Sequence, residues 1–465
     1  MTQATSTQAM YKVTDPATNE TVAEYATATD AEIQDVLARA AAGYTSWRRT
    51  SVGERAAILR RVGELFAERS DDLAAIITRE MGKRTKEAAG EIGLASAIFG
   101  YYAEQGPGML EETPLSPQAG GRASVRKEPI GAVLGVMPWN FPYYQVARLA
   151  APNLLLGNTI VLKHAPQCPE SALAIETLLH DAGVPADAYV NVFASNEQIA
   201  DMIADDRIAG ASVTGSERAG TAVAETAGRN LKKVILELGG SDAFIVLDGE
   251  NLDRTVKAGV AGRMQNTGQA CNGAKRFIVL DPVYDEFVEK FSAALGAMQP
   301  GDPSDPSTQY GPLSSEQAAV TLMEQIEDAV SHGATVKAGG KRPDRPGAYV
   351  EPTVLTDVTP EMRAYREELF GPAAVVYRVA DVDEAVTLAN DSPFGLGGAV
   401  FGSDAELAAD VADRLDTGMV WINSMQGSLP DLPFGGTKRS GVGRELGTLG
   451  IDEFVNQKLI YAPRG

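Results

Sequence analysis

The sequence is poor in the residues that build disulfides and metal sites. Its 465 residues include only two cysteines and three histidines. Two cysteines give no disulfide framework in a chain of this length. The histidines are widely spaced and lack the HExxH or CxxC patterns that hold zinc. We therefore expect neither disulfide cross-links nor a metal ion in this protein.

Long apolar runs and excess positive charge are also missing. No uninterrupted apolar stretch reaches the roughly 18 residues of a membrane helix, and residues 1–25 lack the basic and apolar segments of a signal peptide. The 41 basic residues are outnumbered by 62 acidic ones, which gives a formal net charge of −21. Such a surface repels nucleic acids and anionic membranes. These absences predict a cytoplasmic protein with no nucleic-acid or membrane partner.

The patterns that are present predict an α/β fold. Hydrophobic residues make up 44% of the chain, enough for two or three domains. Near the start, Thr29 with Glu32 and Ser51 with Glu54 have the spacing of capping boxes, which predicts helices. Short apolar runs then alternate with helical segments, as in parallel sheets covered on both faces. The expected strands cover residues 132–138, 159–163, 189–194, 209–214 and 233–238 in one series, and 276–280, 374–379, 397–401 and 419–423 in another.

Cys271 is the leading candidate for chemistry. It lies in the stretch NTGQACNG (residues 266–273), where small neighbours cannot shield its sulfur. A thiol attacks only as the thiolate and needs exposure and nearby donors. The alternative interpretation is an inert buried cysteine, which is the commoner fate of an isolated one.

Two polar residues that end or follow predicted strands can support a nucleophile. Asn140, in PWNFP (138–142), lies beyond the carboxyl end of a strand, where α/β sheets bind ligands, and its amide can donate to a developing oxyanion. Glu237 ends an apolar strand, and a partly dry cleft raises the pKa of a carboxyl towards that of a general base. Alternatively, Asn140 only forms a turn and Glu237 only meets water.

Two other stretches have features of a nucleotide site. Thr214, Gly215 and Ser216 follow a strand and open a helix, so that backbone N–H groups and a hydroxyl can meet a phosphate. Glu368 and Phe370 precede a Gly-Pro turn, where a carboxylate can bind ribose hydroxyls. The glycine-rich stretch 441–447 follows a loop, and we interpret it as a turn that enters the last helix.

Taken together, these stretches resemble the aldehyde dehydrogenase superfamily, from about Thr14 to the C-terminus. The resemblance implies oxidation of an aldehyde to the free acid through a cysteine thiohemiacetal and a thioester, with NADP or NAD as cofactor. It implies that Cys271 is the nucleophile, Glu237 the general base and Asn140 the oxyanion-hole amide. The implied cofactor contacts are Pro138, Trp139, Lys163, Pro166, Thr214, Gly215, Ser216, Leu238, Gly239, Glu368 and Phe370.

The resemblance also implies two Rossmann-like parallel-sheet domains, one cofactor-binding and one catalytic, and a small oligomerisation β-arm. The cofactor-binding domain is expected at residues 1–115 and 131–240, the arm at 116–130 and 453–465, and the catalytic domain at 241–440. A C-terminal helix at 441–452 is expected to return to the cofactor-binding domain. The arm would otherwise leave bare strand edges, so we expect a homodimer or a homotetramer.

Within the superfamily the chain is most similar to the short bacterial succinate semialdehyde dehydrogenases. The similarity is carried by WNFPYYQVARLAAPNLLLGN, LKHAPQCPESAL, ELGGSDAFIV and WINSMQGSLPDLPFGGTKRSGVGREL. It implies that Arg148 grips the substrate carboxylate with its fork of donors, and that Gln265 and Ser428 are further substrate contacts. Longer relatives have a second arginine where this chain has Gln265. The expected substrate is therefore succinate semialdehyde or another small aldehyde.

The stretch KHAP (163–166) bears on the choice of cofactor. NAD-specific members of the superfamily commonly have a glutamate where Pro166 stands, and that carboxylate repels a 2′-phosphate. Pro166 lacks it, while Lys163 can pair with a phosphate, so we expect NADP to be preferred over NAD. The competing functions are a cysteine-dependent esterase or hydrolase, which needs no nicotinamide, and a binding protein that keeps the fold without activity.

Overall fold

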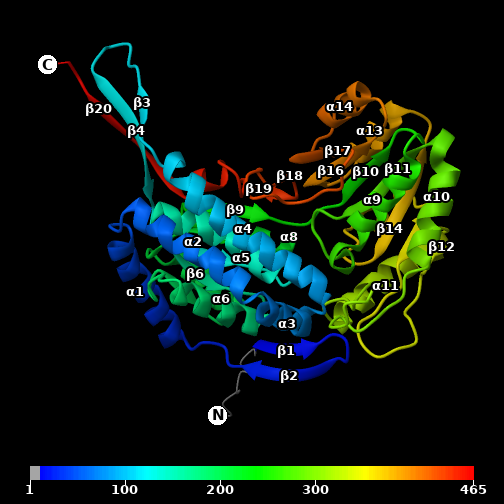
Figure 1. Cartoon of the computed structure of the whole chain (residues 1–465), viewed down its shortest axis with the longest axis horizontal. Coiled ribbons are helices and arrows are strands. Elements are labelled where there is room, and N and C mark those ends of the chain that lie inside the picture. Colours follow the sequence, from blue (N-terminus) through cyan, green and yellow to red (C-terminus); the bar gives the residue numbers. More distant parts are fainter. Residues whose placement is uncertain (1–10, 465) are drawn as a thin grey trace.

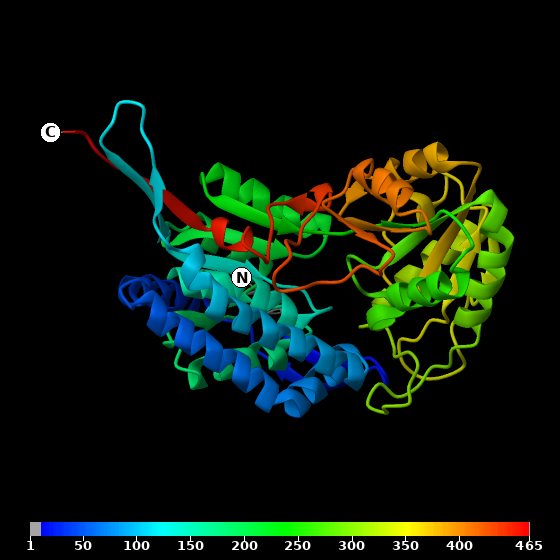
Figure 2. The ribbon, with the colours of Figure 1, turned by 45° about the horizontal axis from the view of Figure 1, so that its top comes forward.

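The computed structural model describes residues 11–464, which form two lobes and a projecting arm (Figure 1). Residues 1–10 and 465, which fall within the expected cofactor-binding domain and arm, lie outside the described residues. Each lobe is built on one sheet of mainly parallel strands, and the arm projects from the first lobe (Figure 2). The α/β class with two parallel-sheet lobes is therefore as expected.

The first lobe contains a six-stranded sheet in the order β19-β9-β8-β5-β6-β7. Its strands are β5 (Ala132–Val136), β6 (Thr159–Lys163), β7 (Tyr189–Asn191), β8 (Ile208–Thr214), β9 (Lys233–Glu237) and the antiparallel β19 (Gly441–Val442). Helices α2, α3, α4, α5 and α6 pack on one side, and α1, α7 and α8 on the other. These helices are α1 (Asp30–Trp47), α2 (Val52–Glu68), α3 (Ser70–Met81), α4 (Thr85–Met109), α5 (Pro142–Leu156), α6 (Pro169–Asp181), α7 (Asn196–Ala204) and α8 (Glu217–Arg229).

The alternation of side chains along these strands explains why the sequence predicted them well. Val133 and Ile160 pack with one group of helices, whereas their neighbours Leu134 and Val161 pack with the other. Both faces of the sheet are dry, so each strand must be apolar throughout. Full burial of one such side chain stabilises the fold by roughly 1.5–3 kcal/mol. A continuous apolar run is therefore the signal that this kind of sheet leaves in a sequence.

The second lobe contains a seven-stranded sheet in the order β12-β13-β14-β11-β10-β16-β17. Its strands are β10 (Asp242–Val246), β11 (Ala274–Leu280), β12 (Thr335–Ala338), β13 (Thr353–Thr356), β14 (Ala373–Val379), β16 (Gly397–Phe401) and β17 (Met419–Ile422). Its helices are α9 (Leu252–Met264), α10 (Asp281–Gly296), α11 (Glu316–Ser331), α12 (Arg363–Arg366), α13 (Val382–Asn390) and α14 (Ala405–Asp413). Two small strands, β15 (Phe394–Gly395) and β18 (Thr437–Lys438), pair beside it.

The arm is a three-stranded antiparallel sheet. Strand β4 (Arg122–Pro129) pairs on one side with β3 (Thr113–Leu115) and on the other with β20 (Val455–Ala462). Figure 1 shows the arm at the upper left, away from the second lobe, with the C-terminus at its end. Two segments far apart in the sequence thus build one sheet.

Two strands near the start were not expected from the sequence. Strand β1 (Tyr11–Asp15) pairs with β2 (Glu20–Tyr25), and the Tyr11 hydroxyl donates to the Ala194 carbonyl of the first lobe at 2.8 Å. Their mixed polar composition gives no apolar run to detect. The two capping boxes that were expected, at Thr29 and Ser51, are both present and begin α1 and α2.

The expectation of a helix at residues 441–452 is wrong. The segment forms β19, a series of turns and a short 3-10 helix, η2 (Gly450–Asp452). Gly441, Gly443 and Gly447 have positive φ angles of 132°, 98° and 54°, which a right-handed helix cannot accommodate. The segment does return to the first sheet, since β19 pairs with β9. No helix among residues 11–464 has the length and apolar character to cross a membrane.

Candidate active site

Cys271 lies where two cavities meet. Cavity A has a volume of 280 Å³, and cavity B has a volume of 380 Å³. Cys271 and Gln145 line both. Cavity A is also lined by Pro138, Trp139, Asn140, Thr214, Gly215, Ser216, Leu238, Gly239, Glu368 and Phe370, and cavity B by Glu87, Gly90, Glu91, Leu94, Phe141, Tyr144, Gln265, Asn266, Asn272, Met425, Gln426, Gly427, Ser428 and Phe434. The thiol can therefore meet two different ligands at once.

The loop that carries Cys271 has an unusual backbone. It connects the short 3-10 segment η1 (Gln265–Gly268) to the amino end of β11, and Asn266 and Thr267 have φ angles of 51° and 53°. Such angles are uncommon for asparagine and rarer for a β-branched threonine. Gly268 is needed next, because a Cβ there would lie 2.2 Å from the Gly371 carbonyl oxygen. Strained backbone of this kind persists only where its surroundings hold it, which suits a functional loop.

Asn140 is held from four directions beside this loop. Its Nδ2 donates to the Gln269 carbonyl at 3.1 Å, and its Oδ1 accepts from Gln145 Nε2 at 3.0 Å. Its backbone carbonyl accepts from Lys83 Nζ at 2.7 Å and from Asn266 Nδ2 at 2.9 Å. The residue is only 4% exposed. Its amide is thus preorganised on the wall of cavity A, next to the thiol.

Glu237 ends β9 and is buried behind the cavities. It is 2% exposed and is not among the lining residues of cavity A or B. Among residues 11–464, neither of its carboxylate oxygens has a hydrogen-bond partner. Burial raises the pKa of Glu237 well above its ordinary value; Glu445 raises it further, and Arg148 and Arg444 lower it. Burial therefore favours the protonated form, and the ionised form is a stronger base than an ordinary carboxylate.

The position of Arg148 differs from the one expected for a direct substrate contact. It is 1% exposed and lines neither cavity. Its Nε lies 2.7 Å from a carboxylate oxygen of Glu445, and its guanidinium lies between the rings of Tyr144 and Phe434. A buried arginine needs such a partner, and Glu445 arrives on the segment that was expected to be helical. The structure thus places Arg148 one layer behind cavity B.

The other expected substrate contacts do line cavity B. Gln265 and Ser428 both contribute to its wall. Sequence reasoning missed Tyr144, whose hydroxyl lies 2.8 Å from Ser428 Oγ and accepts from Arg148 Nη1 at 3.2 Å. Its signal was present, because Tyr144 lies one helical turn before Arg148 on α5 and therefore on the same face. Gln426, also on the wall, has no hydrogen-bond partner for its side chain among the described residues.

Cavity A has the features that a nicotinamide dinucleotide needs. Ser216 caps the amino end of α8, accepting from Ala219 N at 3.3 Å, and free N–H groups at such an end attract phosphate. The Glu368 carboxylate forms part of the wall and can accept from ribose hydroxyls. Trp139 and Phe370 meet edge to face, with ring centroids 5.6 Å apart. Nine of the eleven expected cofactor contacts line this cavity.

The remaining two expected contacts, Lys163 and Pro166, lie outside the cavity wall. Lys163 ends β6, and its Nζ makes no hydrogen bond or ion pair within residues 11–464; burial lowers its pKa to about 8. Pro166 is exposed, and its carbonyl accepts from Lys12 N at 3.0 Å in β1. The Lys163 Nζ lies 5.8 Å from the centre of the Tyr11 ring. A cation at the carboxyl end of a strand, with no anionic partner among the described residues, is available to an anionic ligand.

Burial also governs the Cys271 thiol. It raises the pKa of Cys271 to about 12; Arg148 and Lys275 lower this pKa, and Glu368 and Glu237 raise it. The resting thiol is therefore protonated at neutral pH. The nucleophile must be activated by a change in the charges around it or by a base.

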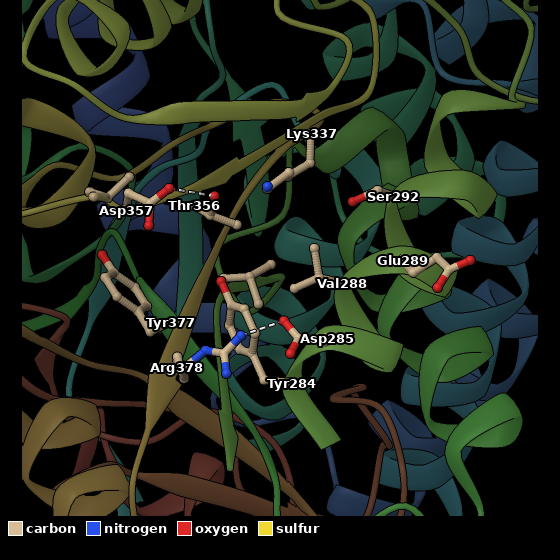
Figure 3. A pocket seen from close by; sticks show the side chains of 12 residues that line it. Tyr284, Asp285, Val288, Glu289, Ser292, Lys337, Thr356, Asp357, Tyr377 and Arg378 are labelled. Carbon is tan, nitrogen blue, oxygen red and sulfur yellow. Dashed lines mark hydrogen bonds and ion pairs between the residues drawn. The ribbon is translucent and has the colours of Figure 1, made fainter. Parts of the chain in front are cut away.

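A larger hollow of 710 Å³ lies elsewhere, on the second lobe between α10 and strands β13 and β14 (Figure 3). Figure 3 shows Arg378 next to Tyr284 and Asp285 on the wall of the hollow. The Arg378 guanidinium is neutralised by ion pairs with Asp281 and Asp285. No thiol lies among the lining residues of this hollow, so size alone does not mark the active site here.

The chain is similar over nearly its whole length to proteins of one family. The model of the aldehyde dehydrogenase family matches residues 2–460. A protein of Deinococcus radiodurans named succinate-semialdehyde dehydrogenase (NADP+) is 59% identical over 452 residues, which cover 97% of this chain and 94% of that protein. A Mycobacterium leprae protein of the same name is 43% identical and covers 96% of this chain and 98% of its own length.

Solved structures agree with these relatives. Succinic semialdehyde dehydrogenase from Streptococcus pyogenes, in complex with NADP+, superposes with a TM-score of 0.96 at 45% identity, over 98% of this chain and all of that one. An aldehyde dehydrogenase from Bacillus cereus, in complex with NAD+, has a TM-score of 0.94 at 30% identity, over 98% of this chain and 93% of that one. The fold is therefore shared by proteins whose structures hold different nicotinamide cofactors.

Proposed function

This chain belongs to the aldehyde dehydrogenase family, and we propose that it oxidises succinate semialdehyde to the free acid with NADP as the preferred cofactor. The observation that carries the proposal is the position of Cys271, which is shared by a cavity suited to a dinucleotide and a second cavity open to a small molecule. An esterase would need only the second cavity.

Cys271 gives its thiol proton to solvent, its Sγ adds to the aldehyde carbon, and the carbonyl oxygen becomes an oxyanion. The Asn140 amide lies on the same cavity wall and donates to that oxyanion, a contact worth about 3–4 kcal/mol in such transition states. Its four hydrogen bonds are already in place, so little reorganisation is needed. When bound, the nicotinamide cofactor supplies the hydride acceptor.

Glu237 serves as the base that activates water for hydrolysis of the resulting thioester. Its position behind the wall requires the carboxyl to turn towards Cys271 for this step. This turn breaks no hydrogen bond, because the carboxylate oxygens have no partner among the described residues. Its high pKa makes the ionised form a good proton acceptor. An enzyme with such a base hydrolyses the thioester and releases a free acid.

NADP preference rests on the end of β6. Lys163 has no anionic partner among the described residues, its Nζ facing the Tyr11 ring, and Pro166 supplies no carboxylate to repel a 2′-phosphate. The relatives from Deinococcus and Mycobacterium are named for NADP+. The Pro166→Glu substitution should raise kcat/KM for NAD relative to kcat/KM for NADP. A native preference for NAD of tenfold or more, about 1.4 kcal/mol, would contradict the proposal.

The substrate carboxylate is held by neutral donors in cavity B. Tyr144 and Ser428 present hydroxyls there, and Gln265 and Gln426 present amides. Arg148 donates to the Tyr144 hydroxyl from behind and so holds that hydroxyl in place. Initial rates over a panel of aldehydes with both cofactors test this assignment. Faster turnover of an uncharged aldehyde of similar length would assign the enzyme to another small aldehyde.

The exposed side chains of the arm support the proposal that the chain assembles into a homodimer or homotetramer. The proposed location is the cytoplasm. Leu115 and Tyr461 on its strands are each 45% exposed, and Leu459 is 63% exposed. Apolar side chains on an open three-stranded sheet favour a partner surface. Light scattering that gives the mass of a single chain at micromolar concentration would contradict this part of the proposal.

A further inference from the structure

Lys275 is a buried lysine beside the nucleophile that the proposed chemistry does not use. It is the second residue of β11 and is 1% exposed. Its ammonium group makes three contacts. It donates to the Ala270 carbonyl at 2.9 Å and to the Cys271 carbonyl at 2.8 Å, and it lies 2.9 Å from Glu368 Oε1. An ammonium group has three N–H donors, so all of them are used.

These contacts connect the two halves of the candidate site. Two of them hold the backbone of the Cys271 loop, and the third holds the carboxylate that faces cavity A. Glu368 also accepts from Gly240 N at 3.2 Å, at the crossing between the lobes. Lys275 itself lines neither cavity. It can therefore act on bound ligands only through Cys271 and Glu368.

The charges around Cys271 show why this link matters. Four charged groups influence the thiol: Arg148 from α5, Lys275 from β11, Glu237 from β9 and Glu368 from the segment before β14. Arg148 is already paired with Glu445. Lys275 is paired with Glu368, whose own charge opposes the thiolate. The net field at the sulfur therefore depends on how strongly Glu368 engages Lys275.

We propose that Lys275 is a positioning residue that couples occupation of the Glu368 end of cavity A to the reactivity of the Cys271 thiol. The proposal rests on the proposed function, since it takes a cofactor ribose as the ligand of Glu368. Hydroxyls that donate to the carboxylate draw its charge away from the ammonium group. The ammonium group then stabilises the thiolate more fully, because its hold on the Cys271 loop is unchanged.

The test measures alkylation of Cys271 by iodoacetamide against pH, with and without NADP+, in the full-length protein. Cys168 is fully buried, and peptide mapping confirms which thiol reacts. In the native protein, NADP+ should accelerate alkylation several-fold near pH 8. In Lys275→Met, the profile should move to higher pH, and a pKa rise of one unit slows alkylation about tenfold at a given pH. The cofactor effect should disappear as well.

Two further variants make the outcome decisive. Lys290→Met removes a lysine on the surface of α10 that pairs with Asp253 and Glu286, and it should match the native profile within about twofold. Glu368→Gln should do the opposite of Lys275→Met, with faster alkylation of the free protein and no NADP+ effect. It also keeps the proposal testable if Lys275→Met does not fold.

Several results would overturn the proposal. One is that Lys275→Met leaves both the pH profile of alkylation and its acceleration by NADP+ unchanged. Another is that Glu368→Gln is alkylated more slowly than the native protein. The third is that NADP+ does not change alkylation of the native protein. These outcomes do not depend on aldehyde turnover. If the aldehyde panel failed while alkylation still responded to NADP+ through Lys275, the assigned substrate would be wrong and the coupling would stand.

Discussion

The two sheets contribute to the candidate site from opposite ends. In the first lobe, the candidate residues end or follow strands at the carboxyl edge of the sheet, as Trp139, Ser216 and Glu237 do. In the second lobe they precede strands at the amino edge, as Cys271 precedes β11 and Phe370 precedes β14. The chain crosses directly from β9 to β10 at residues 238–241. The site therefore lies where one carboxyl edge faces one amino edge.

This difference shows that the general rule for ligand sites holds for only one lobe. Parallel α/β sheets usually bind ligands beyond their carboxyl ends, and cavity A follows that rule for the first sheet. The carboxyl edge of the second sheet has a larger hollow, near Thr356 and Arg378, but no thiol lines it. The second lobe instead supplies the nucleophile from its amino edge, on a loop with strained backbone.

The largest expected effect comes from removing the candidate nucleophile, which lies at the amino edge of the second sheet. Cys271→Ala should lower aldehyde oxidation by about 10⁴-fold or more, as removal of a nucleophile does in other enzymes. NADP+ binding should persist, because cavity A is built mainly by the first lobe. Steady-state rates and a fluorescence titration with NADP+ measure the two properties separately. Retained turnover would show that another residue is the nucleophile.

Removing Glu237, the proposed base at the carboxyl edge of the first sheet, should stop hydrolysis of the thioester. Glu237→Gln should lower the steady-state rate by about 10²- to 10⁴-fold, while each site still produces one reduced cofactor in a rapid burst. The thioester forms but water is not activated. Rapid-mixing absorbance measurements detect the burst. A slow steady rate without a burst would mean that Glu237 acts before the thioester, and full activity would mean that another base is used.

Replacing Arg148 tests whether the buried residues behind cavity B have only a structural role. Arg148→Met leaves Glu445 as an unpaired buried charge, which typically costs about 3–5 kcal/mol of stability. Thermal unfolding should show the loss, and kcat/KM should fall by a similar factor for succinate semialdehyde and for an uncharged aldehyde. A much greater loss for succinate semialdehyde would show that the guanidinium reaches the substrate carboxylate directly.

The cofactor side should respond to pH through Lys163. The pKa of Lys163 is lowered from its ordinary value of 10.5 to about 8, so its charge is present below pH 8 and is lost above it. The Kd for NADP+ should therefore be steady below pH 8 and rise up to about tenfold per pH unit above it. In Lys163→Met the rise should vanish. A pH-independent Kd in the native protein would place the 2′-phosphate away from this lysine.

The smallest effect is expected at the carboxyl edge of the second sheet. Arg378→Ala removes a surface cation from the wall of the hollow in Figure 3, where it is paired with Asp281 and Asp285. Aldehyde kcat/KM should change by less than about twofold, because this edge contributes nothing to cavities A or B. A loss of tenfold would show that the two edges of the second sheet are coupled.

Local patterns in the sequence located most strands of the two sheets, although β10, β12 and β13 were not among those expected. Much of the wall of cavity A was implied by the family resemblance. Buried parallel strands must be continuously apolar, so strands such as β6 and β16 could be located from the sequence. Motif residues that follow strands, such as Trp139 and Ser216, came with them, because the end of a strand is also visible in the sequence. The β1–β2 hairpin and the glycine-rich turns at 441–452 were missed or misassigned, because neither leaves an apolar period.

Only the tertiary structure decided how the charges near Cys271 are paired. Arg148 binds Glu445 and Lys275 binds Glu368, and each pair joins segments that are far apart in the sequence. A sequence shows that a lysine or an arginine is present, but its partner depends on which loops the two sheets bring together. Because a buried charge must find a partner, that packing moved Arg148 away from its expected place at the substrate and brought Lys275 beside the nucleophile.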